Sequence, residues 1–263
     1  MATSIGKYSL ISLTLDQDIA RLTLCSPPVN AMSQQLTSEI SAALDELEKS
    51  NDWSVLQFAS NQKVFSAGGD LALMSGWFKE SAPGDHISKY AAGVQKLMNR
   101  IAAIPNVTMA EVGGPALGGG CELVLATDVC IASRSAKLGV PEAGIGLLPA
   151  AGGTQRLTAR CGAAMAKRLI LGAEPVTAEM AQQIGIVQWV VDPEELVSQS
   201  NAIARRFASM PKLARRLNKD CIAAALDPAR DGFAVEIENS RALGNAPDSR
   251  ERITAFLAGA RNK

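Results

Sequence analysis

The sequence predicts an α/β fold, in which stacked or spiral units of strand and helix are followed by an all-helical tail. Three times, a short strand leads into a glycine-rich turn and then an apolar helix, at residues 58–70, at 112–126 and, more loosely, at 138–154. Such repetition favours a stacked or spiral arrangement over a single doubly wound sheet. No strand pattern appears after Val191, which indicates the helical tail.

Strands are expected where apolar residues alternate or form short runs. In residues 19–24, Leu22 and Leu24 share one face while Arg21 and Thr23 share the other, as in a half-buried strand. Further strands are expected at 55–59, 107–112 and 129–132.

Two helices of the body follow from apolar residues at helical spacing. Residues 33–49 carry Leu36, Ile40, Leu44 and Leu47 on one face. A second amphipathic helix spans residues 94–104 and ends before Pro105.

The tail begins at Asp192, which is a candidate N-cap because Pro193 follows at the first helical position and Glu195 at the third. This helix is expected to run towards Met210. Three more helical stretches are expected, opening at Pro211 and Asp227 and covering residues 248–258. We therefore expect residues 1–191 to form the body with the functional site, and residues 192–263 to form a helical region.

Composition limits the classes of partner. Lysine and arginine total 26, as do aspartate and glutamate, so the formal net charge is zero. A neutral chain creates no field that would attract nucleic acid or an anionic membrane, and it opposes self-association little. Neither a nucleic-acid partner nor a membrane partner is expected.

The cysteines indicate the compartment. Five cysteines are widely spaced without a CxxC motif, and His86 is the only histidine, which favours neither a disulfide framework nor a zinc site. The first 15 residues lack the pattern of a secretory signal, and no apolar run approaches the roughly 20 residues that cross a bilayer. We expect a cytoplasmic protein.

The glycine-rich turns are candidate binding elements. A turn before a helix leaves the first backbone N–H groups unpaired, and glycine lets a ligand approach them closely. Two such turns, with Gly69 and Gly119 as donors, would form an oxyanion hole if they converged on one oxygen. A single glycine-rich turn is more often only a tight turn. The G-x-G-x-x-G, GxxxxGK[ST] and GxSxG motifs are all absent.

Two glutamates are the candidate acid/base groups. Glu122 stands among Cys121, Leu123 and Val124, so burial is expected to raise its pKa. Glu142 follows Pro141 at the end of a short strand, where a surface or capping role would be the ordinary one.

Four blocks of sequence resemble the signature blocks of the crotonase superfamily, which contains the enoyl-CoA hydratases and isomerases. They stand in the family's order and approximate spacing, and they are FSAGGD (65–70), ALGGGCELVLATD (116–128), LGVPEAGIGLLP (138–149) and AGGTQRL (151–157). Two further segments also match, RLTLCSPPVNAMS (21–33) and LGAEPVTAEMAQQIGIVQWVV (171–191), so the resemblance covers nearly the whole chain.

The resemblance implies a crotonase-like spiral of ββα units, with a C-terminal helical region that packs subunits into trimers or dimers of trimers. It implies that the N–H groups of Gly69 and Gly119 hold the thioester oxygen, and that the Ala67 carbonyl contacts the adenine of coenzyme A. It extends acyl-CoA binding to the residues around them, namely Ser66, Ala67, Gly68, Asp70, Leu71, Leu117 and Gly118. For Asp70 itself, a turn or capping role is the ordinary reading.

Glu122 and Glu142 both fall where hydratases carry their two acid/base glutamates, so the resemblance implies an enoyl-CoA hydratase. Glu122 would deprotonate water, and Glu142 would protonate the α-carbon. Neither a metal nor a separate cofactor is needed, because coenzyme A is part of the substrate. Three alternatives stay open: enoyl-CoA isomerisation, hydration of aromatic or branched acyl groups, and a non-catalytic or RNA-binding role.

The sequence departs from the family pattern around the nucleotide. A lysine that family members often carry is replaced by Ala72, and Val29 stands where a basic residue is common. The C-terminal segment is also shorter than in many relatives. Candidate replacements are Lys63, Arg261 and Lys263.

Four further residues have weaker signals in the sequence. His86 is expected in a polar loop, and Met74, Trp77 and Phe78 are candidates to line the acyl pocket.

Overall fold

The computed structural model describes residues 2–50 and 52–260. Its main sheet has seven strands in the order β1-β2-β3-β4-β5-β7-β10. The bounds are β1 Thr3–Ser4, β2 Ile11–Asp16, β3 Ile19–Leu24, β4 Val55–Ser60, β5 Val107–Val112, β7 Val129–Ser133 and β10 Trp189–Val191. From β3 to β10 all neighbouring strands are parallel, so their carboxyl ends meet at one edge of the sheet.

A small second sheet joins segments of the chain that lie beyond this edge of the main sheet. It has three strands in the order β6-β8-β9, with bounds β6 Ala116–Leu117, β8 Lys137–Gly139 and β9 Val176–Thr177. The strand β6 pairs with β8 in parallel, which brings the chain after Leu117 beside the chain after Gly139.

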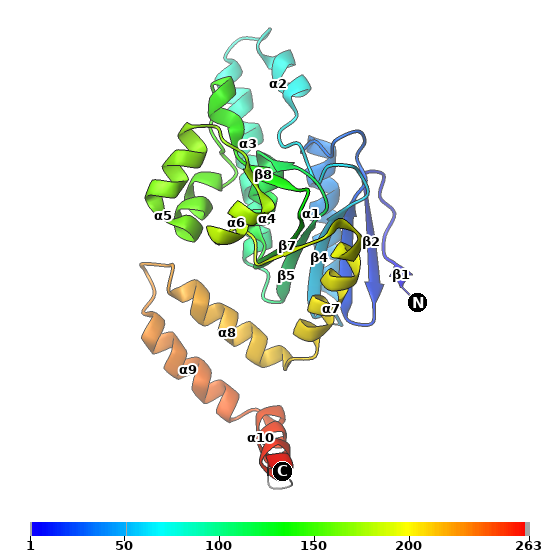
Figure 1. Cartoon of the computed structure of the whole chain (residues 1–263), viewed down its shortest axis with the longest axis vertical. Coiled ribbons are helices and arrows are strands. Elements are labelled where there is room, and N and C mark those ends of the chain that lie inside the picture. The colour runs from blue at the N-terminus through cyan, green and yellow to red at the C-terminus, as the bar shows by residue number, and fades with distance from the viewer. Residues whose placement is uncertain (1, 51, 261–263) are drawn as a thin grey trace.

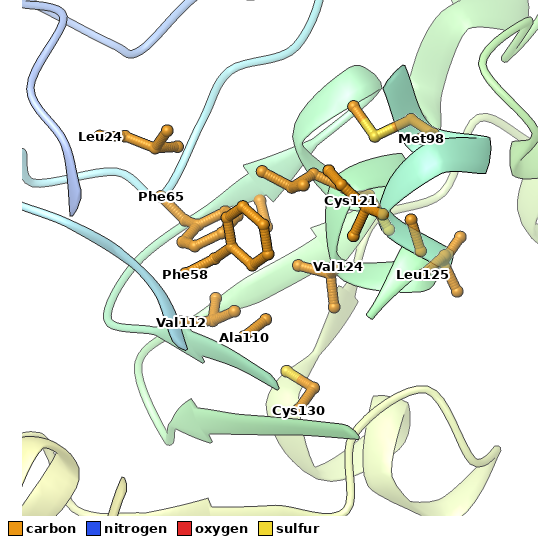
Figure 2. Close-up of a cluster of buried hydrophobic side chains, with 14 of the residues drawn as sticks. Leu24, Phe58, Phe65, Met98, Ala110, Val112, Cys121, Val124, Leu125 and Cys130 are labelled. Carbon is orange, nitrogen blue, oxygen red and sulfur yellow. The ribbon is translucent and has the colours of Figure 1, made fainter. Parts of the chain in front are cut away.

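Helices cover both faces of the main sheet (Figure 1). One face carries α1 (Gln34–Lys49), α3 (Pro83–Ala102), α4 (Gly119–Ala126) and α5 (Gly153–Leu171), whose apolar residues share the main core. Figure 2 shows part of this core, in which Phe58 of β4 and Phe65 lie among side chains of α4 such as Val124. The opposite face carries α7 (Leu196–Ala208), which packs on Val55, Met109 and Ile131.

The remaining helices are short or lie towards the C-terminus. Short ones are α2 (Leu71–Trp77), η1 (Pro141–Ile145), α6 (Ala178–Gln183) and η2 (Pro193–Glu195). The C-terminal helices are α8 (Lys212–Ala224), α9 (Gly232–Gly244) and α10 (Pro247–Ala260), which extend away from the body (Figure 1). Two hydrogen bonds hold α8 against the body. Arg215 Nη1 donates to Ser54 O at 2.9 Å, and Lys219 Nζ donates to Asp128 Oδ2 at 2.8 Å.

Most of the expected strands and helices are present. Two of the predicted helix starts were wrong. The helix expected from residue 94 begins at Pro83, because proline and Asp85 suit the first turn, and this places His86 in a helix rather than a loop. The helix expected to open at Asp227 begins at Gly232, because the Asp231 carboxylate accepts from Ala234 N at 3.1 Å as its cap.

The proposed cap at Asp192 is also corrected. Its side chain makes no capping bond, and a short 3₁₀ segment precedes α7. Its Oδ1 accepts instead from Arg134 Nε at 2.8 Å, which uses the carboxylate elsewhere. Within the described residues, every helix is too short or too polar to cross a bilayer.

Candidate active site

The two glycine-rich turns meet because β4 and β5 are neighbouring parallel strands, and each turn leaves the same edge of the sheet. Hydrogen bonds join the turns directly. Phe65 N donates to Pro115 O at 2.9 Å, and Leu117 N donates to Ser66 O at 2.9 Å. Two segments some 50 residues apart in sequence thus form one rigid unit.

Close approach of the backbones requires glycine at two positions. Gly68 has φ +96°, and a Cβ there would lie 2.7 Å from Leu117 O. Gly118 has φ +52°, and a Cβ there would lie 2.8 Å from Glu142 Oε1. A side chain at either position would push apart the parts of the site that the turns bring together.

The N–H groups of Gly69 and Gly119 are available to a ligand. Gly119 is the first residue of α4, so its N–H has no acceptor inside the helix. Within the described part of the chain, neither N–H donates to another turn or to a side chain. Both glycines line a single cavity of about 460 Å³. The predicted pair of donors therefore faces one space.

Glu122 lies on α4 with 3% of its surface exposed, and it lines the same cavity. Its Oε1 accepts two backbone hydrogen bonds, from Ala151 N at 2.7 Å and from Gly153 N at 2.8 Å. Burial raises the pKa of Glu122 to about 7; the Gly153 hydrogen bond opposes the rise, and the nearby Glu142 carboxylate adds to it. The carboxyl group is held in place and titrates near neutrality.

Glu142 reaches the cavity from η1, on the chain that follows β8. The pairing of β6 with β8 and a bond from Gly118 N to Gly139 O at 2.8 Å set its position beside the second glycine turn. Its Oε2 is buried and has no hydrogen-bond partner among the described residues, and burial raises its pKa. An unpaired buried oxygen is costly and is typical of functional sites.

The four candidate catalytic groups therefore share one cavity, whose remaining wall is largely apolar. A carboxyl group on each of two segments and two free amide donors suit a reaction that moves protons and stabilises an oxyanion.

Comparisons with known proteins identify the family to which the chain is similar. The sequence profile of the family described as enoyl-CoA hydratase/isomerase matches residues 14–261. A crotonyl-CoA hydratase from Syntrophomonas wolfei is 35% identical over 260 residues, which cover 95% of each chain. A 2,3-dehydroadipyl-CoA hydratase from Escherichia coli is 33% identical over 249 residues, which cover 94% of this chain and 92% of the relative.

The chain belongs to the enoyl-CoA hydratase/isomerase family.

A solved structure of this family extends the comparison to the fold. The enoyl-CoA hydratase from Bacillus anthracis superimposes with a TM-score of 0.89 at 28% identity, over 95% of this chain and 97% of that chain. The crotonase-like fold and the family expected from the sequence are both confirmed. The expected enzyme class, an enoyl-CoA hydratase, agrees with the names of these relatives.

The other residues predicted to bind acyl-CoA in this family member differ in accessibility. Leu71 lines the cavity, and Ala67 is exposed. Ser66 is buried, where its Oγ donates to Asn30 O at 2.7 Å and accepts from Gly68 N at 3.2 Å, so it shapes the turn. Asp70 caps α2 by accepting from Leu73 N at 3.0 Å, which confirms the capping role. Their contacts with coenzyme A stay predictions.

Sequence reasoning missed Tyr90. Its hydroxyl donates to Met32 O at 2.6 Å and accepts from Asp70 N at 3.2 Å, so it braces the chain immediately after Gly69. The spacing of Tyr90 and Val94 on one face of α3 signals burial, but no pattern in the sequence identifies the two backbone partners. The N–H donors of Ala151 and Gly153 were missed for the same reason.

The aromatic candidates for the acyl pocket are partly corrected. Met74 lines the cavity, as predicted. Trp77 stacks on His86 with ring centroids 6.0 Å apart and lines the neighbouring groove between α1 and α3, so it is not among the residues that line the cavity. Phe78 is 63% exposed and lies outside the residues that line the cavity.

Of the candidate cations for coenzyme A phosphates, Lys63 lies exposed on the turn that precedes Phe65. Arg261 and Lys263 lie outside the described residues.

Proposed function

We propose that this protein catalyses reversible syn addition of water to a 2-trans-enoyl-CoA, giving a 3-hydroxyacyl-CoA. The observation that carries the proposal is that Glu122 and Glu142 line one cavity together with the N–H groups of Gly69 and Gly119. Two carboxyl groups in one cavity suit the addition of both parts of water to the same face of a substrate.

In the proposed reaction, Glu122 acts as the base. It takes a proton from water while the water oxygen bonds to the β-carbon, and the electron pair of the double bond moves towards the thioester oxygen. Two observations support this role. The hydrogen bonds from Ala151 and Gly153 hold one carboxylate oxygen and leave the other for water, and a pKa of about 7 makes the group an effective base near neutral pH.

Glu142 supplies the proton that completes the addition. Burial raises its pKa, which favours a protonated carboxyl group able to donate to the α-carbon. The enolate then returns to a thioester carbonyl. Glu122 has gained one proton and Glu142 has lost one, so a proton must pass between them before the next turnover.

The proposed oxyanion hole stabilises the enolate between these steps. The N–H groups of Gly69 and Gly119 would donate to the thioester oxygen as negative charge develops there. A fixed donor of this kind is worth ~3–4 kcal/mol. The proposed steps use only proton transfers and hydrogen bonds, so no metal or redox cofactor is part of the proposal.

The test is hydration of crotonyl-CoA, followed by the loss of absorbance of the conjugated thioester. We expect Glu122→Gln and Glu142→Gln each to lower kcat by about 10²- to 10⁴-fold. The matched control is Glu194→Gln, whose carboxylate is exposed at the start of the helical tail. Full activity in either site variant would remove that residue from the mechanism, and an inactive wild type would contradict the proposal.

Isomerisation of a 3-enoyl-CoA is the alternative within the family, because one carboxylate is enough to shuttle its proton. The two carboxyl groups favour hydration. Isomerase activity that survives Glu122→Gln, in a protein that hydrates crotonyl-CoA poorly, would favour the alternative.

We also propose that the protein works as a homotrimer or as a dimer of trimers in the cytoplasm. Large apolar side chains on α9 and α10 support the association, because Phe233 is 84% exposed and Phe256 is 76% exposed in the single chain. The free state of all five cysteines is compatible with a reducing compartment.

A further inference from the structure

The helix α3 has two chemically different faces. Ile87, Ala91 and Val94 lie at helical spacing and line the cavity of the candidate active site. His86 and Lys89 line the separate groove between α1 and α3. The histidine and the lysine of this part of α3 therefore line the groove and not the space beside the catalytic groups.

The opposite wall is also apolar. After Glu142, the chain contributes Ile145, Leu147 and Leu148 to the cavity. Among the described residues that line it, none is lysine, arginine or histidine. The hydroxyl of Tyr90 is already engaged by Met32 and Asp70. The Ser88 hydroxyl donates to Asp85 O at 3.1 Å, and the Gly69 and Gly119 N–H groups are assigned to the thioester oxygen. The wall thus offers no cation to pair with an anionic end of the acyl chain.

The cavity is large compared with a four-carbon acyl group. Its volume of about 460 Å³ lies within the roughly 300–1,000 Å³ of sites for whole small molecules. A crotonyl group placed with its carbonyl at Gly69 and Gly119 would leave apolar wall between α3 and η1 uncovered.

We propose that the enzyme prefers 2-enoyl-CoA substrates with uncharged acyl chains of six to eight carbons, and that it discriminates against chains that end in a carboxylate. This inference rests on the proposed function and specifies its substrate class. Each methylene group buried against the wall raises kcat/KM about fourfold. A terminal carboxylate would be buried without a cation and near Glu122 and Glu142, which lowers kcat/KM at least about 30-fold.

The first experiment measures kcat/KM for 2-butenoyl-, 2-hexenoyl- and 2-octenoyl-CoA, and for 2,3-dehydroadipyl-CoA, which has six carbons and a terminal carboxylate. We expect a rise from the four-carbon to the eight-carbon substrate, and a value for dehydroadipyl-CoA far below that for hexenoyl-CoA. A maximum at four carbons, or equal values for the two six-carbon substrates, would overturn the inference while leaving hydration intact. Failure to hydrate any of them would instead contradict the proposed function.

A pair of variants tests whether contacts with α3 determine the preference for longer acyl chains. Ala91→Phe fills the cavity, whereas Ala92→Phe adds the same side chain at an exposed neighbouring position outside it. We expect Ala91→Phe to lower kcat/KM for octenoyl-CoA at least tenfold more than it lowers kcat/KM for butenoyl-CoA. Ala92→Phe is expected to change neither. Equal losses on both substrates, or no loss on either, would show that the acyl chain does not occupy this wall.

Inhibition of the wild type gives a test that depends on no variant. Saturated butyryl-CoA and octanoyl-CoA bind without reacting, so their inhibition constants report ground-state contacts. We expect octanoyl-CoA to inhibit at least tenfold more tightly. Equal constants would contradict an acyl chain buried between α3 and η1.

Discussion

The backbone N–H of Gly153 lies 2.8 Å from Oε1 of Glu122, so the first residue of α5 holds a carboxylate that belongs to α4. Ala151 donates to the same oxygen at 2.7 Å, and its own carbonyl accepts from Arg156 Nη1 at 3.0 Å. The AGGTQRL block therefore fixes one oxygen of the proposed base. The second oxygen is left for the substrate water.

Replacing Gly153 by alanine should reduce catalysis by displacing this carboxylate. A Cβ at position 153 would lie 2.9 Å from Glu122 Oε1 and 2.8 Å from Pro149 Cβ. We expect Gly153→Ala to lower kcat at least tenfold with a smaller change in KM, measured with crotonyl-CoA. The control is Gly93→Ala in α3, where a Cβ would meet nothing within 4 Å. Unchanged kcat in Gly153→Ala would show that the position of Glu122 is not critical.

The pH dependence of kcat/KM should report the ionisation of Glu122. The proposed base must be deprotonated, and burial raises its pKa to about 7. We expect kcat/KM to fall about tenfold for each pH unit below 7, and to fall again at higher pH where Glu142, the proposed acid, loses its proton. A profile that is flat between pH 5 and pH 8 would contradict a base with this pKa.

Ionisation of Glu122 should also lower stability. The folded protein keeps the proton up to about pH 7, whereas the unfolded chain releases it near the ordinary value of 4.5. Between these values the unfolded state binds fewer protons, so the free energy of unfolding falls as the pH rises.

The neutral Glu122→Gln variant avoids that loss and keeps an acceptor for both N–H groups. We expect it to be about 2–3 kcal/mol more stable than the wild type at pH 8, and much closer to it at pH 5, by urea denaturation. Exposed Glu194→Gln is the control at both pH values. A difference that does not depend on pH would contradict the linkage.

Asn30 should be essential to the opening segment. It is fully buried; its Nδ2 donates to Phe65 O at 2.9 Å and to Ser60 Oγ at 2.8 Å, and its φ is +49°. Aspartate tolerates this backbone conformation but cannot donate, and it buries a charge beside the Phe65 carbonyl. We expect Asn30→Asp to lower the free energy of unfolding by at least about 3 kcal/mol. Exposed Asn218→Asp is the control, expected to change it by less than about 1 kcal/mol.

The exposed apolar residues of the tail should control association. Light scattering on purified protein is expected to give three or six times the protomer mass. Phe233→Glu should shift the protein towards monomer, whereas Phe78→Glu, at an exposed position next to α2, should not. A monomeric wild type at micromolar concentration would contradict the proposed assembly.

Local patterns in the sequence determined much of the fold. The alternation of Leu22 and Leu24 with Arg21 and Thr23 was enough for β3, and the spacing of Leu36, Ile40, Leu44 and Leu47 was enough for α1, because burial on one face has a fixed period. The glycine blocks and the apolar neighbours of Glu122 likewise marked Gly69, Gly119 and Glu122 as candidates, whereas Glu142 became a catalytic candidate through the family resemblance. The expected division of the chain at residue 192 stays a prediction.

Tertiary structure alone decided which groups meet. Pairing of β4 with β5 and of β6 with β8 brings Gly69, Gly119 and Glu142 around one cavity, and contacts between strands distant in sequence leave no local signature. The sequence also could not show that backbone N–H groups donate to Glu122 or that the Tyr90 hydroxyl donates to a backbone carbonyl. Every residue except proline carries the same backbone donor and acceptor, so such partners cannot be recognised from residue types. The sequence determined the chemical groups, and the packing of the sheets decided their geometry.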